Sequence, residues 1–207
     1  MLKVYTGHAV RAALFMGQDR TRTAELSWYF IHKIAGLKDQ KIVWPANIED
    51  IMFGSVDGTH TSNNEPRHPT MRKDPKNYSH KFKMPGLNHE VVLDLWTNRC
   101  IHVKTADKAS VHDLTAFRME LQGKIPAGRR LICDRGYICF KNGENLKLAF
   151  PNPMDHPDVK EFKNRARARH ENFNKLLKHY GCLSKKFIHG VTKLQICFDA
   201  VLVLKNK

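Results

Sequence analysis

The sequence predicts an α/β domain in which short strands are followed by long helices. Apolar runs bounded by turn residues occupy the middle of the chain and are typical of buried strands. From residue 157 onward, apolar residues instead recur every three or four positions, as on a helix that packs on a sheet. A chain of 207 residues is long enough to bury one sizeable core.

Two helices are expected before the strands, within residues 8–37. A break at Gly17 separates them, and Thr21 or Thr23 could cap the second helix. Both a helix-turn-helix fragment and a helical hairpin that only covers a sheet edge fit this pattern. Trp44-Pro45 marks a boundary between a helical segment, residues 1–45, and the main domain, residues 46–207.

The main domain is expected to alternate strands and helices. A long loop rich in proline, asparagine and lysine, residues 62–86, separates the first two strands. The strands are expected at residues 51–56, 87–96, 99–105, 130–133 and 148–151, and the helices at 110–121, from 157 onward, and at 194–204.

The composition favours a folded protein that binds polyanions. Lys and Arg number 35 against 20 Asp and Glu, which gives a formal charge of +15. A hydrophobic content of 42% argues against a disordered basic tail. The five cysteines form no C-x-x-C pair, so we expect reduced thiols. Without a signal-peptide pattern or a membrane span, the chain is expected to be soluble and intracellular.

Three acidic residues are the candidate catalytic and metal-binding residues. Asp57 and Asp134 each end an apolar strand-like run, with a glycine following closely, so their carboxylates are expected at strand ends. Glu171 lies inside the long helix, nearly opposite its apolar stripe of Val159, Phe162, Ala166, Phe173, Leu176 and Tyr180. Taken alone, Glu171 also fits a solvated helix face with weak ion pairs. Only a tertiary fold could bring the three acids together.

The chemistry that suits three carboxylates is metal-assisted phosphodiester cleavage. Two Mg²⁺ or Mn²⁺ ions about 4 Å apart activate the attacking oxygen and neutralise the leaving one. Such hard cations prefer oxygen ligands, which Asp and Glu supply. Candidate DNA-phosphate contacts are basic residues of the long loop and the long helix, namely Lys81, Lys83, Arg167, Lys175 and Lys178.

Six short segments surround the candidate acids and follow one another along the chain: Val56-Asp57-Gly58-Thr59-His60, Tyr78-Ser79-His80-Lys81-Phe82-Lys83, Pro85-Gly86-Leu87-Asn88-His89-Glu90, Val111-His112-Asp113, Cys133-Asp134-Arg135-Gly136-Tyr137 and Arg169-His170-Glu171-Asn172-Phe173-Asn174. In this order they resemble DDE-superfamily endonucleases, specifically the catalytic domain of Harbinger-type transposases. The resemblance covers about residues 45–205, and its Asp-x-Gly-Tyr and Arg-His-Glu elements are its most specific parts.

The resemblance implies an RNase H-like fold, a mixed sheet flanked by helices, with Asp57, Asp134 and Glu171 as a two-metal triad. Asp113 matches a further acidic position and is a candidate accessory acid, although at a helix start it could equally be a capping group. The chain departs from the family in two places. The family's amino-terminal DNA-binding domain is expected to be missing or reduced to residues 1–45, and residues 102–111 lack the expected glycines.

The expected function is therefore that of a nuclear, Mg²⁺- or Mn²⁺-dependent DNA endonuclease or strand-transfer domain derived from a transposase. DNA is the expected partner, with a homo-oligomer or a helper DNA-binding protein as further candidates. The alternative is a domesticated or decayed transposase that binds DNA without catalysis. An RNA-cleaving RNase H-like enzyme would suit the carboxylates equally well, but it does not match the family segments.

Overall fold

The structure is a computed structural model that describes residues 2–3, 19–64, 74–104, 107–138 and 143–206. The first of the two helices expected within residues 8–37 falls outside these ranges, as do part of the long loop and Cys139. Cys100, Cys133, Cys182 and Cys197 are buried free thiols, as the cysteine pattern predicts. No helix among the described residues is both long and apolar enough to cross a membrane.

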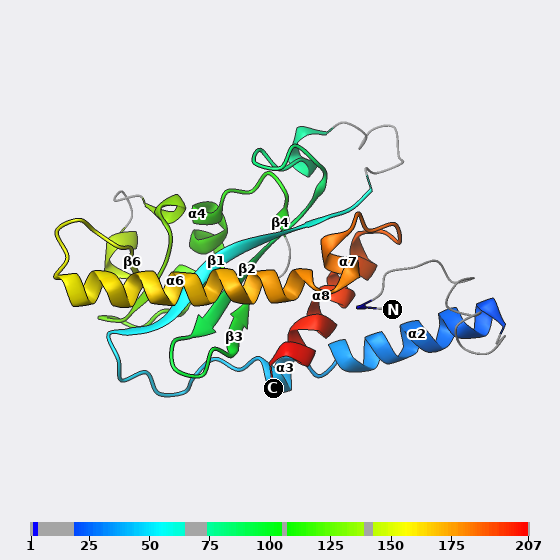
Figure 1. Cartoon of the computed structure of the whole chain (residues 1–207), viewed down its shortest axis with the longest axis horizontal. Coiled ribbons are helices and arrows are strands. Elements are labelled where there is room, and N and C mark those ends of the chain that lie inside the picture. Colours follow the sequence, from blue (N-terminus) through cyan, green and yellow to red (C-terminus); the bar gives the residue numbers. More distant parts are fainter. Residues whose placement is uncertain (1, 4–18, 65–73, 105–106, 139–142, 207) are drawn as a thin grey trace.

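A mixed sheet forms the centre of the fold (Figure 1). Its strands follow the order β3-β2-β1-β5-β6, with β4 paired to β2. The first strands pair antiparallel, whereas β5 and β6 run parallel to β1. The α/β prediction with a mixed sheet is confirmed. The strands are β1 (Met52–Ser62), β2 (Gly86–Asp94), β3 (Cys100–Val103), β4 (Asp107–Lys108), β5 (Arg130–Ile132) and β6 (Leu148–Ala149).

Helices flank both faces of this sheet, and Figure 1 shows α6 lying across it. Val91 and Leu93 of β2 pack on one side with residues of α6, α7 and α8, whereas Val92 packs on the other side with α4 and η2. The helical elements are α2 (Arg20–Ala35), α3 (Lys38–Lys41), η1 (Pro75–Asn77), α4 (Asp113–Ala116), η2 (Phe117–Leu121), α5 (Gln122–Lys124), η3 (Arg135–Tyr137), η4 (Glu144–Leu146), α6 (Pro157–Lys178), α7 (Gly181–Ser184) and α8 (Val191–Lys205).

Strand β1 is longer than the apolar run that predicts it. Asp57 lies in the middle of β1 and pairs with Val91 of β2, so the expectation that it ends a strand is wrong. The polar residues after Asp57 remain in the strand because β2 pairs with them as far as Ser62. On its other edge, β1 pairs with β5 only up to Ser55. Asp57 therefore lies just beyond the end of β5, where that edge of β1 becomes accessible.

The buried face of α6 also differs from the predicted apolar stripe. The buried residues are Lys163, Ala166, His170, Phe173 and Leu177, whereas Val159 is 37% exposed. Two polar side chains, Lys163 and His170, thus belong to the buried face because each has a polar partner inside the fold. This rotates the buried stripe toward Glu171, which consequently borders the sheet instead of lying opposite it.

The amino-terminal helix α2 packs on the main domain. Its cap is Asp19, whose carboxylate accepts a hydrogen bond from the Arg22 N–H at 2.8 Å, so neither Thr21 nor Thr23 is the cap. Ile31 is buried in the same cluster as α8 residues such as Phe198. The segment before residue 46 therefore shares a hydrophobic cluster with the domain that follows it.

Asn206, directly after α8, fixes the edge strand β3. Its side-chain oxygen accepts from the Cys100 N–H at 2.6 Å, and its amide donates to the Cys100 carbonyl at 2.9 Å and to the Lys41 carbonyl.

Asn206→Ala would leave buried backbone groups unsatisfied, so we expect a loss of about 3 kcal/mol in unfolding free energy. Urea unfolding monitored by circular dichroism measures this loss. The exposed Asn172→Ala should change stability by less than about 0.5 kcal/mol, and an equal effect of both changes would contradict the assignment.

Candidate active site

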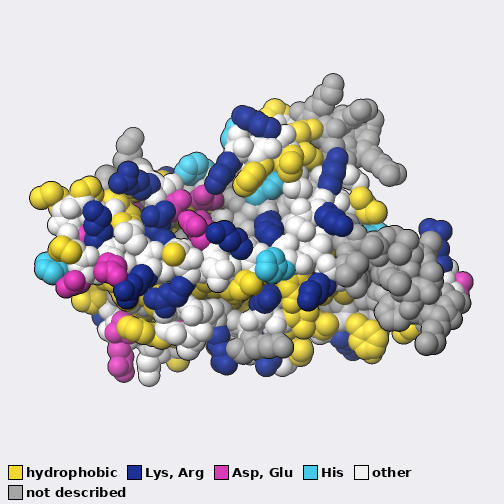
Figure 2. Space-filling view, viewed as in Figure 1, with side chains coloured by type: hydrophobic (Ala, Val, Ile, Leu, Met, Phe, Trp, Pro, Cys, Tyr) yellow, Lys and Arg dark blue, Asp and Glu magenta, His cyan; other side chains and the backbone are white. Residues whose placement is uncertain are grey.

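The three predicted acids line one small pocket of about 40 Å³. Asp57 comes from β1, Asp134 follows β5, and Glu171 comes from α6. Figure 2 shows acidic side chains gathered above α6, with Lys and Arg around them. Segments distant in sequence thus converge at one place, as the function proposed from the sequence requires. The lining residues are Ser55, Val56, Asp57, Ile132, Asp134, Arg167, His170 and Glu171.

Asp57 is held firmly but is electrostatically crowded. One carboxylate oxygen accepts from the Gly58 N–H at 2.8 Å, and the other accepts from the Asn174 side-chain amide at 2.9 Å. Burial, followed by the negative charges of Asp134 and Asp113, raises the pKa of Asp57 to about 7. The Gly58 N–H and the Lys81 ammonium act in the opposite direction without cancelling this effect. A further positive charge would stabilise the ionised carboxylate.

Asp134 sits at the turn between β5 and η3. Its carboxylate accepts from the Gly136 N–H at 2.7 Å and so caps the short helical turn. A Cβ at position 136 would lie 2.9 Å from this oxygen, so a side chain there would displace the Asp134 carboxylate. The Asp-x-Gly sequence is therefore explained locally, because the turn orients one carboxylate oxygen and leaves the other available.

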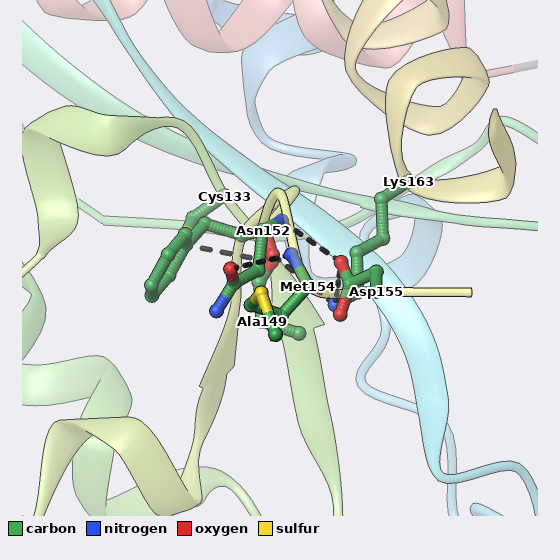
Figure 3. A network of polar contacts seen from close by, with 7 residues as sticks. Cys133, Ala149, Asn152, Met154, Asp155 and Lys163 are labelled. Carbon is green, nitrogen blue, oxygen red and sulfur yellow. Dashed lines mark hydrogen bonds and ion pairs between the residues drawn. The ribbon is translucent and has the colours of Figure 1, made fainter. Parts of the chain in front are cut away.

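A polar network links the loop after β6 to Lys163 of α6 (Figure 3). The Lys163 ammonium donates to the Phe150 carbonyl at 3.1 Å and to the Asp155 carboxylate at 2.9 Å. Asp155 in turn accepts from the Asn152 N–H at 2.8 Å. Through these contacts the loop after β6 fixes the first half of α6. The position of Glu171 relative to Asp134 therefore depends on this network.

Asp113 lies beside Gly58, next to the pocket. Its carboxylate accepts from the Asn88 amide at 3.0 Å, and a Cβ on Gly58 would lie 2.5 Å from it. The helix cap is His112, whose Nδ1 accepts from the Leu114 N–H, so the capping alternative for Asp113 is wrong. Its charge contributes to the raised pKa of Asp57. Asp113 is thus close enough to act on the site electrostatically.

Sequence reasoning missed the buried polar pair beside Glu171. The Ser55 hydroxyl and Nδ1 of His170 form a hydrogen bond of 2.8 Å between β1 and α6. Burial lowers the pKa of His170 to about 3, which keeps the ring neutral. Both residues line the pocket, while Glu171 itself is exposed. The burial of His170 could have been predicted from the sequence. On a helical wheel, His170 falls on the same side of α6 as the apolar residues Ala166 and Phe173.

The predicted basic residues occupy two kinds of position. Lys81, Lys83 and Lys175 are exposed, and Arg167 lines the pocket. Lys178 instead points inward, where its ammonium donates to the carbonyls of His60 and Leu183. Burial lowers the pKa of Lys178 to about 8. Lys178 is thus a link between α6 and β1 and does not have the free ammonium expected of a DNA contact.

The carboxylates share the pocket without forming a ready-made ligand cluster. Within the described ranges, no group of three or more His, Cys, Asp or Glu side chains is arranged so that it could hold a metal ion as it stands. A bound cation would therefore require the side chains around Asp57 and Asp134 to draw closer together. Glu171, as the exposed member, has the most freedom to do so.

No protein-family model matches this chain, and no curated protein or solved structure is significantly similar to it.

Proposed function

We propose that this protein is a divalent-metal-dependent DNA endonuclease or strand-transfer domain of the DDE type, derived from a Harbinger-like transposase. The observation that carries the proposal is the convergence of Asp57, Asp134 and Glu171 on one pocket from three separate elements. An RNase H-like arrangement is part of the proposal. The strand order β3-β2-β1-β5-β6, with α6 across the sheet, is compatible with it.

The donor set fits Mg²⁺ or Mn²⁺. Asp57, Asp134 and Glu171 would hold the metal through carboxylate oxygens, which hard cations prefer. The raised pKa of Asp57 reflects burial and the repulsion of Asp134 and Asp113, and a cation relieves this kind of repulsion. When bound, two such ions activate the attacking oxygen of phosphodiester cleavage and neutralise the leaving oxygen. Asn174 and the Gly58 N–H orient Asp57 for this role.

The charges around the pocket suit a nucleic-acid backbone. Arg167 lines the pocket, and Lys81 is close enough to lower the pKa of Asp57. The formal charge of +15 supplies long-range attraction to phosphates. The acidic residues of the pocket would bind the metal, and the basic residues around it would bind the DNA phosphates at the same place. We propose a nuclear location on the same grounds, since DNA is the substrate.

Metal-dependent nicking of supercoiled plasmid DNA tests the proposal. We expect nicking by the wild-type chain with Mg²⁺ or Mn²⁺, none in EDTA, and loss of activity in Asp134→Asn. The matched control is Asp158→Asn at the exposed start of α6, which should retain activity.

Equal nicking by the Asp134 variant and the wild type would refute the proposed chemistry. DNA binding without nicking by the wild type would instead support the non-catalytic alternative. Preference for an RNA–DNA hybrid over duplex DNA would indicate the RNA-cleaving alternative.

A further inference from the structure

An exposed aromatic ring stands between lysines on the loop before β2. Phe82 is 49% exposed, with Lys81 and Lys83 on either side of it in the sequence. The Lys81 ammonium lies 5.5 Å from the centre of the Phe82 ring. Figure 2 shows hydrophobic side chains gathered on the same face as the acidic group, with Lys and Arg near them. An exposed ring among cations is the composition of a surface that stacks nucleobases.

The loop that carries Phe82 is built as a tight, fixed turn. Tyr78 and Pro85 form a β-bridge that closes it. The buried Ser79 accepts the Phe82 N–H on its hydroxyl at 3.2 Å and the Lys83 N–H on its carbonyl at 2.9 Å. Lys83 has φ +54, a left-handed backbone conformation that non-glycine residues seldom adopt. The exposure of Phe82 is therefore set by backbone hydrogen bonds.

One face of the Phe82 ring is already stacked. The His60 ring of β1 lies against it, with ring centroids 5.0 Å apart and planes inclined by 27°. Burial, followed by the charge of Lys178, lowers the pKa of His60 to about 4. The imidazole is thus neutral near pH 7. Gly86 makes this placement possible, because a Cβ there would collide with the His60 ring. Phe82 remains 49% exposed beside this contact, with the Lys81 ammonium over the same ring.

The aromatic pair lies farther along β1 than the acidic pocket. His60 is three residues beyond Asp57, or about 10 Å along the strand, and its side chain points to the opposite face of the sheet. Lys81, beside Phe82, still acts electrostatically on the Asp57 carboxylate. A DNA strand with one phosphate in the pocket would therefore be within a few nucleotides of the Phe82 ring. In a paired duplex the bases are stacked inside the helix and their faces are not accessible to such a ring.

We propose that Phe82 stacks on one unpaired DNA base beside the pocket, so that the preferred substrate is DNA with a nucleotide out of the double helix. The base would continue the stack begun by His60 and Phe82, and Lys81 and Lys83 would contact the adjoining phosphates. This inference rests on the proposed function, because it assigns the form of DNA that the same site accepts. Stacking is tolerant of base identity, so a preference for structure over sequence is expected.

Fluorescence anisotropy in EDTA tests the proposal separately from cleavage. Three labelled probes are compared: a paired DNA duplex, the same duplex with one unpaired nucleotide, and an RNA duplex with that unpaired nucleotide. We expect Phe82→Ala to weaken binding of the unpaired DNA probe about tenfold and binding of the paired duplex less than about twofold. Phe82→Trp should preserve or strengthen the preference, because a larger ring can still stack.

Phe30→Ala is the matched control. Phe30 is also an exposed phenylalanine, with 58% of its surface accessible, but it lies on α2. It should leave all three affinities unchanged. Equal losses on paired and unpaired DNA, no loss at all, or a larger loss on RNA would overturn the inference. A different outcome is that Phe82→Ala weakens binding of the unpaired DNA probe selectively, while the wild type fails to nick DNA. That outcome would refute the proposed nuclease activity and still support base stacking by Phe82.

Discussion

Asp57→Asn is expected to abolish DNA nicking while stabilising the metal-free protein. Loss of a carboxylate ligand removes several kcal/mol of transition-state stabilisation, or about a thousandfold in rate. Removal of the charge relieves the crowding by Asp134 and Asp113 that raises the pKa of Asp57 to about 7. After allowance for one weakened hydrogen bond, a gain of about 2 kcal/mol is expected, or roughly 4–8 °C in melting temperature.

The gain in stability should depend on pH. Because the pKa of Asp57 is raised from 3.8 to about 7, the folded protein binds more protons than the unfolded chain between these values. The wild type therefore loses stability as pH rises from about 4 to 7. Asp57→Asn removes this loss, so the difference between the two proteins is largest above pH 7. Melting temperatures in EDTA at pH 5 and pH 8 measure it.

The control for Asp57 is again Asp158→Asn, which removes a carboxylate from an exposed helix start. It should change neither nicking nor the pH dependence of melting. Mn²⁺ should raise the melting temperature of the wild type more than that of Asp57→Asn, since a ligand stabilises only the state that binds it. A melting temperature for Asp57→Asn below that of the wild type at pH 8 would show that the carboxylate is needed for folding.

Glu171→Gln is expected to reduce nicking by at least about a hundredfold without weakening DNA binding. The glutamate is exposed at the rim of the pocket and has little role in packing. Its replacement by the uncharged isostere should therefore leave the melting temperature in EDTA within about 1 °C of the wild type. Plasmid nicking and anisotropy on duplex DNA separate the two effects.

Glu161→Gln provides the matched control on the same helix. Glu161 is exposed and pairs with Arg165 one turn later, so its loss should cost little stability and no activity. If Glu171→Gln retained full nicking, α6 would not contribute a ligand, and Asp57 and Asp134 alone would carry the metal. The result thus decides whether the pocket needs all three carboxylates.

The residue types at the site could be predicted from the sequence, but part of its geometry could not. Asp134 and Gly136 form the turn expected from their order, because a short carboxylate next to a glycine caps locally. Asp57 was misplaced at a strand end, because the polar residues after it give no apolar signal and are held in β1 by pairing with β2. Such pairing depends on a partner more than twenty residues away.

The buried face of α6 shows the same limit. An apolar stripe is visible in the sequence, but Lys163 and His170 are buried because Phe150, Asp155 and Ser55 supply polar partners from other elements. Hydrophobic periodicity cannot detect such partners. The rotation of the buried face by these two residues brings Glu171 to the pocket.

By itself, the sequence determined the alternation of strands and helices and the positive charge, because these follow from local periodicity and composition. The choice of Asp57, Asp134 and Glu171 as a set came from the resemblance of their segments to a known family, since periodicity alone left Glu171 on a solvated helix face. The tertiary structure decided which acids meet, that Lys178 points inward, and that Phe82 stands exposed against His60. These outcomes depend on strand register and on contacts between distant segments. The residues next to each of these side chains in the sequence do not determine its position. Each position is set only when the sheet and α6 pack together.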